Sequence, residues 1–206
     1  GIFVAAIPVI FLIGALLSSP NNLSPGGPLT FLPDANGHRD PLPQTTPVVL
    51  QIDIEGVIGS KKLNAESVKK QLQESKEGPL KDKRVKAVLI SLNSPGGTVH
   101  DSDLIYRAIM NYKKEFNIPV YAYVDSFCAS GGVYIASAAD KIFASDTSLI
   151  GSIGVLLQFM NFSQALDKIG VEAKTLISGK NKDAMNPLRP WTSEEDKDFQ
   201  QLSSFF

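Results

Sequence analysis

One stretch near the middle of the chain limits the possible folds more than any other. Residues 119–125 form an apolar run rich in β-branched and aromatic residues, which is typical of a buried strand. Ser130 follows directly before two glycines, and small residues then continue with helical character. A strand, a sharp turn and a helix in this order place a hydroxyl at a helix N-terminus, where free backbone N–H groups can stabilise an oxyanion. This is a common setting for a nucleophilic serine.

Ser130 also has a simpler interpretation as a helix N-cap, with Gly131 and Gly132 as a point of close packing, because serine is a favoured capping residue. Cys128 lies two residues earlier, so a thiol nucleophile is a further alternative. For Cys128 we favour a small apolar filler beside the turn, since free cysteine is among the most buried residue types. This stretch alone does not decide between a catalytic and a structural serine.

The composition narrows the classes of function. The 206 residues are 43% hydrophobic and carry a formal net charge of -1, which suits one globular domain with an appendage. A nearly neutral chain gives no electrostatic reason to expect nucleic acid as a partner. The single cysteine excludes a disulfide framework and a cysteine-rich zinc site. Only His38 and His100 are available for histidine chemistry, and we expect no metal and no organic cofactor.

The N-terminal third predicts a membrane attachment. Residues 2–17 are apolar and uncharged, slightly short of the roughly 20 residues that a spanning helix needs, and we expect residues before Gly1 to complete the span. A cleaved signal peptide is the alternative, but Ser18-Ser19-Pro20 is a poor cleavage site. A buried core helix is disfavoured because the run has no polar face. We expect an anchor over residues 1–18, a Pro-, Gly-, Asn- and Ser-rich linker that includes His38 over residues 19–46, and a folded domain over residues 47–206 that continues beyond this sequence.

Hydrophobic periodicity predicts alternating strands and helices in the folded domain. We expect strands at residues 48–54, 85–92, 119–125, 141–144 and 172–177, and helices at residues 64–76, 101–116, directly after Ser130, at 162–169 and from a capping box at 192–195. This alternation predicts an α/β architecture with mainly parallel crossovers. The apolar run at 85–92 further predicts a sheet covered on both faces.

A second glycine turn, Gly96-Gly97, follows the strand expected at residues 85–92. In an α/β sheet, ligands bind beyond the carboxyl ends of the strands, so this turn and the Ser130 turn can face one crevice. Two backbone N–H groups from two turns suffice for an oxyanion hole. Taken alone, the second turn would be an ordinary loop.

A serine hydroxyl is a weak nucleophile and needs a base. No histidine follows Ser130, but a lysine can serve if burial keeps it neutral. The polar, glycine-bearing segment 178–187 offers Lys180 and Lys182, and spacing does not choose between them. Either lysine would also fit as a solvated surface residue.

Four blocks in one order carry a family resemblance. They are residues 93–97, residues 129–132 with 138–142, residues 151–155, and Ser178-Gly179 followed by Lys182, Asp183 and Pro187. Over about residues 48–199 the chain resembles the signal peptide peptidase A family of membrane-anchored serine peptidases. The resemblance implies the Clp protease and crotonase-like fold, with repeated ββα units preceded by an N-terminal transmembrane helix.

The resemblance also assigns roles to individual residues. It implies that Ser130 is the nucleophile, that Lys182 is the general base, and that Ser152 orients the lysine. Gly97 and Gly131 match the positions whose N–H groups form the oxyanion hole. The family further implies a ring-like homo-oligomer with shared active sites, in which a neighbouring subunit can donate the lysine.

The function expected from this resemblance is a Ser–Lys endopeptidase that degrades remnant signal peptides and other small or unfolded polypeptides. Residues 2–17 would enter the lipid bilayer of the bacterial cytoplasmic (inner) membrane in a single pass, with the catalytic domain on the extracytoplasmic side. The alternatives are a crotonase-type acyl-CoA enzyme and a catalytically silent membrane scaffold of the same fold. A Clp-like Ser-His-Asp peptidase is contradicted by the lack of a histidine after Ser130.

Overall fold

The structure is a computed structural model that describes residues 32, 37, 46–77, 80, 81, 83–179 and 181–205. The expected anchor and most of the expected linker, His38 included, lie outside the described residues, as does Lys180. Among the residues that are described, no helix combines the length and apolar character needed to cross a bilayer.

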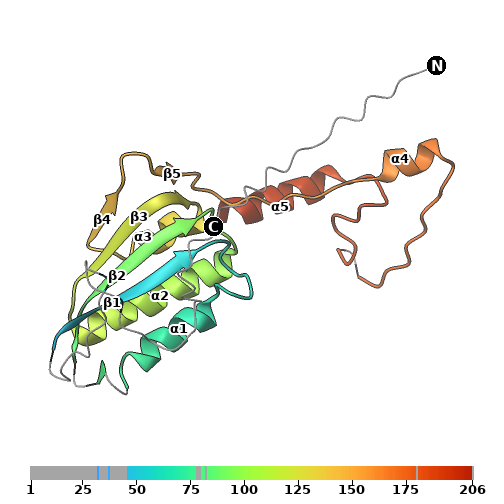
Figure 1. The fold of residues 1–206 in the computed structure, drawn as a ribbon. Helices are drawn as coiled ribbons and strands as arrows, with labels where there is room; N and C mark the ends of the chain where they lie inside the picture. The colour runs from blue at the N-terminus through green and yellow to red at the C-terminus, as the bar shows by residue number, and fades with distance from the viewer. Residues whose placement is uncertain are drawn as a thin grey trace.

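A five-stranded parallel sheet organises the domain (Figure 1). Four strands follow one another across the sheet in chain order, and a fifth pairs with the C-terminal part of the third. The strands are β1 (Val48–Glu55), β2 (Val85–Ser94), β3 (Val120–Ala129), β4 (Lys141–Ala144) and β5 (Leu149–Gly151). Because all pairs are parallel, the carboxyl ends of β2 and β3 meet at one edge, as the α/β prediction requires.

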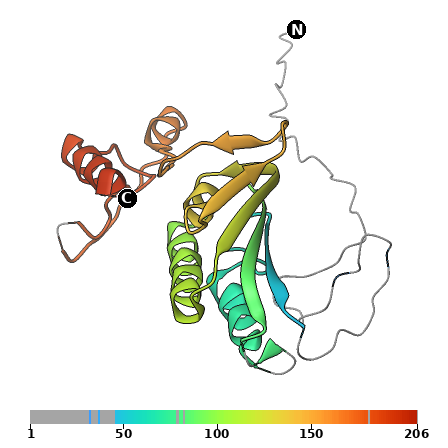
Figure 2. The same ribbon diagram turned by 90° about the vertical axis from the view of Figure 1, so that its left-hand side faces the viewer.

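Three helices lie on one side of the sheet: α1 (Ala65–Glu74), α2 (Val99–Phe116) and α3 (Gly131–Ala136) (Figure 2). Asn64 caps α1 by accepting a hydrogen bond of 3.0 Å from the Ser67 N–H. Within residues 46–151 a single strand precedes each of these helices, so the repeat is βα rather than the expected ββα. Each parallel neighbour needs a crossover, and here a helix provides it.

The expectation that both sheet faces are covered is wrong for the described residues. Side chains along β1 alternate strictly, with Leu50, Ile52 and Ile54 buried and the intervening residues half-buried or exposed. Strand residues point alternately to the two faces, so the buried set faces the helices. The apolar run of β2 fits this pattern as well, because its residues on the open face are only half-buried or exposed.

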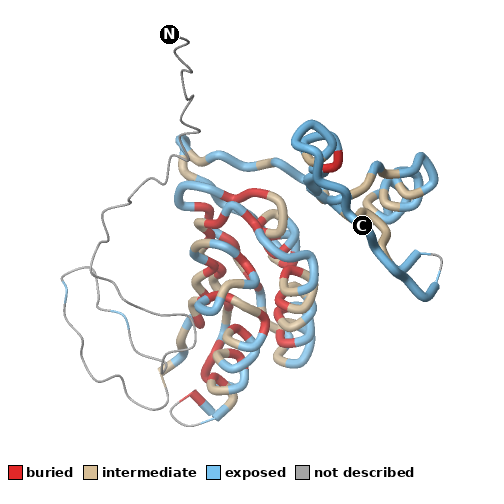
Figure 3. Tube along the Cα trace, turned by 90° about the vertical axis from the view of Figure 1, so that its right-hand side faces the viewer, coloured by how far each residue is buried: buried red, intermediate tan, exposed pale blue. Residues whose placement is uncertain are grey.

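Residues 152–205, called the arm below, extend away from the sheet and carry α4 (Ser163–Lys168) and α5 (Ser193–Phe205) (Figures 1 and 3). Ser163 is the only buried residue among those described in the arm. The strand expected at residues 172–177 is wrong: this segment has no regular secondary structure. A strand needs a partner for its backbone groups, and within the described chain none pairs with this segment.

Candidate active site

Ser130 lies in the sharp turn between β3 and α3. Its backbone has φ 51° and ψ -118°, a positive-φ conformation that residues with a side chain rarely adopt. The hydroxyl makes no capping hydrogen bond to α3, so the N-cap interpretation is not supported. The backbone N–H of Ser130 instead donates to the Gly151 carbonyl oxygen at 3.0 Å. The turn is therefore anchored through its backbone, and the half-buried side chain is left for another purpose.

The second glycine turn packs directly against Ser130. Gly96 has φ 93°, and a Cβ atom at this position would lie 2.8 Å from the Ser130 Cβ and 3.0 Å from the Gly131 nitrogen. Neither contact leaves room for a side chain, so glycine is required by space as well as by backbone conformation. The structure thus brings together the two turns that the sequence placed at neighbouring strand ends.

The Gly97 N–H is available to a ligand. The turn pairs with Ile58, whose N–H donates to the Gly96 carbonyl at 2.9 Å and whose carbonyl accepts from the Thr98 N–H at 3.0 Å. Within the described chain the Gly97 N–H has no acceptor. Gly131 is the first residue of α3, where a helix leaves its N–H groups unpaired. Two free donors from two touching turns are the elements of an oxyanion hole.

Two buried serines, Ser94 and Ser102, fix this geometry, and no sequence pattern predicted a role for either. Ser94 donates to the Gly56 carbonyl at 2.6 Å and accepts from the Gly96 N–H at 3.1 Å. Ser102 donates to the Thr98 carbonyl at 2.7 Å, and its hydroxyl occupies the space that a Cβ at Gly131 would need. The only sequence signal for Ser94 is a hydroxyl at the end of an apolar strand. Its hydrogen-bond partners become apparent only in the folded structure.

Cys128 is fully buried beneath the turn, paired with Ser94 across β2 and β3. Burial raises the pKa of the Cys128 thiol, which disfavours the reactive thiolate. The filler interpretation therefore fits the structure better than a thiol nucleophile. Among the described residues, no His, Cys, Asp and Glu side chains gather in a group of three that could hold a metal ion.

Ser152 lies close to Ser130 in the fold, whereas Lys182 lies in the arm. Ser152 directly follows Gly151, the residue that anchors the Ser130 backbone, and its side chain is exposed. Lys182 lies on an exposed turn of the arm, where its N–H donates to the Gly179 carbonyl at 3.3 Å. The structure brings Ser130, Ser152, Gly97 and Gly131 to one edge of the sheet. Among the described residues, no contact links Lys182 to these four residues.

A strained serine between a strand and a helix, next to a second turn with an unpaired N–H group, is an arrangement suited to nucleophilic acyl transfer. Residues 112–203 match the family model described as peptidase family S49. An Enterococcus faecium protein named after the signal peptide peptidase SppA is 36% identical over 163 residues, covering 75% of this chain and 46% of that protein. The chain is a relative of the S49 peptidases, and its resemblance to the signal peptide peptidase A family is confirmed.

Further similar proteins include another curated relative and a solved structure. A Brucella melitensis protein named Na(+)/H(+) antiporter NhaA is 43% identical over 114 residues, which cover 55% of this chain but 16% of that protein. A solved structure of a membrane-bound stomatin-specific protease matches with 24% identity and a TM-score of 0.46, covering 56% of this chain and 52% of that one. The chain spans less than half the length of the two relatives named here.

Proposed function

We propose that this protein is a serine endopeptidase in which Ser130 is the nucleophile and Lys182 the general base. The observation that carries the proposal is the contact between the Gly96-Gly97 turn and the strained Ser130 turn. This contact supplies a hydroxyl and two free N–H groups at the carboxyl ends of adjacent parallel strands. The relation to the S49 peptidases supports the same chemistry.

In this mechanism the Ser130 Oγ attacks the carbonyl carbon of the scissile peptide bond while Lys182 Nζ takes the hydroxyl proton. The carbonyl oxygen becomes negatively charged and accepts hydrogen bonds from the N–H groups of Gly97 and Gly131. The C–N bond then breaks, Lys182 returns its proton to the leaving amine, and an acyl-enzyme remains on Ser130. Water, deprotonated by Lys182, attacks the ester carbonyl carbon. The bond from that carbon to the Ser130 oxygen then breaks, and Lys182 returns the proton to this oxygen, which releases the carboxylic acid and the free serine. Ser152 would hold the lysine amine in place.

Lys182 would reach Ser130 from a neighbouring subunit of a homo-oligomer. The arm supports this arrangement because it carries large apolar side chains that nothing in its own described chain covers, such as Ile153 and Leu176, which are 81% and 86% exposed. Exposed apolar surface of this kind is typical of a protein–protein interface. A second copy that covered the arm would bury these side chains and could bring Lys182 to the serine of its partner.

The proposed substrates are remnant signal peptides and other small or unfolded polypeptides. Residues 2–17 would anchor the protein in the bacterial cytoplasmic membrane, with the catalytic domain on the extracytoplasmic side. An uncharged apolar run followed by a linker rich in proline and glycine supports this placement. An apolar peptide left in the bilayer would then be presented close to the active site.

A serine-reactive fluorophosphonate probe tests the proposal on the full-length protein in membranes or detergent. Mass spectrometry should locate the probe on Ser130, and labelling should be abolished in Ser130→Ala and reduced to a slow residual rate in Lys182→Ala. Ser137→Ala, an exposed serine after α3, is the matched control and should label normally. If Lys182 is shared between subunits, oligomers assembled from both inactive variants together should regain labelling. A folded, assembled parent protein that leaves Ser130 unlabelled would refute the peptidase function and direct attention to acyl-CoA binding and scaffold roles.

A further inference from the structure

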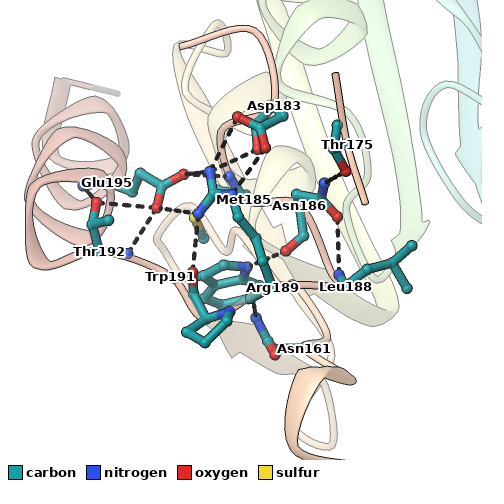
Figure 4. Close-up of polar contacts among 11 residues, drawn as sticks. Asn161, Thr175, Asp183, Met185, Asn186, Leu188, Arg189, Trp191, Thr192 and Glu195 are labelled. Carbon is teal, nitrogen blue, oxygen red and sulfur yellow. Dashed lines mark hydrogen bonds and ion pairs between the residues drawn. The ribbon is translucent and has the colours of Figure 1, made fainter. Parts of the chain in front are cut away.

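The arm contains a compact network of ion pairs around Arg189, shown in Figure 4. Its guanidinium donates from Nε to Asp183 Oδ2 at 2.9 Å and from Nη2 to Glu195 Oε1 at 2.6 Å. Nη1 donates to Glu195 Oε2 at 3.0 Å, and Nη2 also reaches the Asp183 backbone carbonyl at 3.0 Å. The carboxylate side chains are well covered, with 15% of Asp183 and 13% of Glu195 exposed.

This network joins a helix to a series of turns. Glu195 lies in the first turn of α5 and accepts from the Thr192 N–H at 2.7 Å, which completes the capping box predicted from the sequence. Asp183 lies in a series of turns with no regular secondary structure. Arg189 bridges them, and its hydrogen bonds hold the pKa of both carboxyl groups below their usual values. The N-terminal turn of α5 therefore serves as a fixed support for the turns.

Further hydrogen bonds attach the same turns to α5 and to the rest of the arm. The Met185 N–H donates to Glu195 Oε1 at 3.1 Å, and the Trp191 indole N–H donates to the Asn186 carbonyl at 2.7 Å. Met185 has φ 57°, a backbone conformation that is uncommon for residues other than glycine. Residues 183–186 thus have a defined backbone although they are close to the surface.

Lys182 directly precedes Asp183, and this adjacency gives the network a functional meaning. We propose that Arg189 is a positioning residue that fixes the loop so that the Lys182 amine enters the active site in one orientation. The proposal rests on the proposed function, in which Lys182 is the general base. A base on an exposed loop needs such support, because a displacement of about 1 Å can reduce a rate about 100-fold.

Arginine is suited to this role and lysine is not. Its planar fork contacts two carboxylates and a backbone carbonyl at the same time. A lysine ammonium has three donors on a flexible stem and no fixed plane. Arg189→Lys should therefore retain the charge but only part of the orientation.

The test compares Arg189→Met, Arg189→Lys and Asp183→Asn in the full-length, assembled protein. The matched control is Arg107→Met, since Arg107 forms a similar ion pair with Asp103 at 2.7 Å on α2, outside the arm. Initial rates with a fluorogenic peptide give kcat and KM, and fluorophosphonate labelling of Ser130 gives the reactivity of the nucleophile. Size-exclusion chromatography and thermal unfolding report assembly and folding.

We expect Arg189→Met to lower kcat about 100-fold while KM changes less than about twofold, because chemistry and not substrate contact is impaired. Arg189→Lys should recover part of the loss, and Arg107→Met should behave as the parent. Adding Arg189→Met to Lys182→Ala should not slow residual labelling further, since Arg189 would act through Lys182. A merely structural role would slow both backgrounds.

Several outcomes would overturn the inference. One is parent-like kcat in a folded and assembled Arg189→Met, and another is an equal effect in the Lys182→Ala background. If Arg189→Met fails to fold or assemble, Asp183→Asn is the deciding variant, because it weakens the same ion pair while keeping the shape of the side chain. Unchanged kcat in Asp183→Asn would then overturn the inference. Normal labelling of Lys182→Ala would instead refute the proposed function, so the two failures are distinguishable.

Discussion

The backbone N–H of Ser130 donates a 3.0 Å hydrogen bond to the carbonyl oxygen of Gly151. This bond continues the pairing of β3 with β5 past the end of the ladder, so that the chain after β5 begins beside the proposed nucleophile. Ser152 is the next residue after Gly151, whose carbonyl holds the Ser130 backbone. Its φ of 53° directs the following chain away from the sheet. The position expected to orient the lysine is fixed by the same sheet that holds the serine.

Ser152→Ala should lower kcat by roughly 10- to 100-fold, because a hydrogen bond to a charged group contributes about 1.5–3 kcal/mol and 1.4 kcal/mol is about tenfold. The exposed side chain makes little contribution to folding, so thermal unfolding should be unchanged. Peptide hydrolysis and Ser130 labelling measure the effect, with Ser137→Ala as the control. Parent-like rates would remove Ser152 from the site.

Gly96→Ala should abolish labelling of Ser130. An added Cβ would lie 2.8 Å from the Ser130 Cβ, and the positive φ adds strain of about 1–3 kcal/mol. Gly132→Ala is the matched control, because its Cβ would lie 3.4 Å from the nearest atom, the Ser94 carbonyl oxygen, and its φ is not in the left-handed region. Labelling and urea unfolding of both variants provide the comparison. Equal behaviour of the two variants would contradict the contact between the turns.

Cys128→Ala should keep full activity, because the thiol is buried and burial raises its pKa. In the parent protein, iodoacetamide at neutral pH should leave Cys128 unmodified, since little thiolate forms and the reagent has no access. Modification should proceed after unfolding in guanidinium. Mass spectrometry of the labelled protein measures both states. Loss of peptide hydrolysis in a folded Cys128→Ala would revive the thiol as a participant.

Much of the sheet could be predicted because its signals are local. Apolar runs with β-branched residues marked β1 to β4, and the predicted strand at residues 85–92 differs from β2 by two residues at its end. The two glycine turns could be brought together from sequence, since strand ends in a parallel sheet share an edge. The capping box at Thr192 was likewise readable, because its partners are three residues apart.

What could not be predicted depends on contacts that only the folded chain brings together. Ser94 fixes the Gly96-Gly97 turn through Gly56, which lies 38 residues earlier, and no periodicity predicts that bond. The expected strand at 172–177 has apolar residues of the right kind, but a strand forms only where another strand accepts its hydrogen bonds. The bridge made by Arg189 joins a turn to a helix, a relation that spacing alone did not reveal.

The pH dependence of the free energy of unfolding should show that Asp101 stabilises the turn that contains Gly97. Its carboxylate accepts from the Ala65 N–H at 2.9 Å and from the Thr98 hydroxyl at 2.7 Å, and these bonds lower its pKa below the usual value. A carboxyl group with a depressed folded-state pKa contributes stability above its unfolded pKa of about 3.9, and that contribution is lost as the pH falls further.

Urea unfolding at pH 7, 5 and 3.5 should therefore show a smaller loss of stability on acidification for Asp101→Asn than for the parent, because the amide does not titrate. Asp53→Asn, on β1, is the control, since its carboxylate accepts from Gln51 in its own strand and caps no helix. Parallel curves for the parent and Asp101→Asn would show that Asp101 does not link α1 to the Thr98 turn in solution. A shallower curve for Asp101→Asn alone would show that the turn supplying the Gly97 N–H is held from the side of α1 by a charged acceptor.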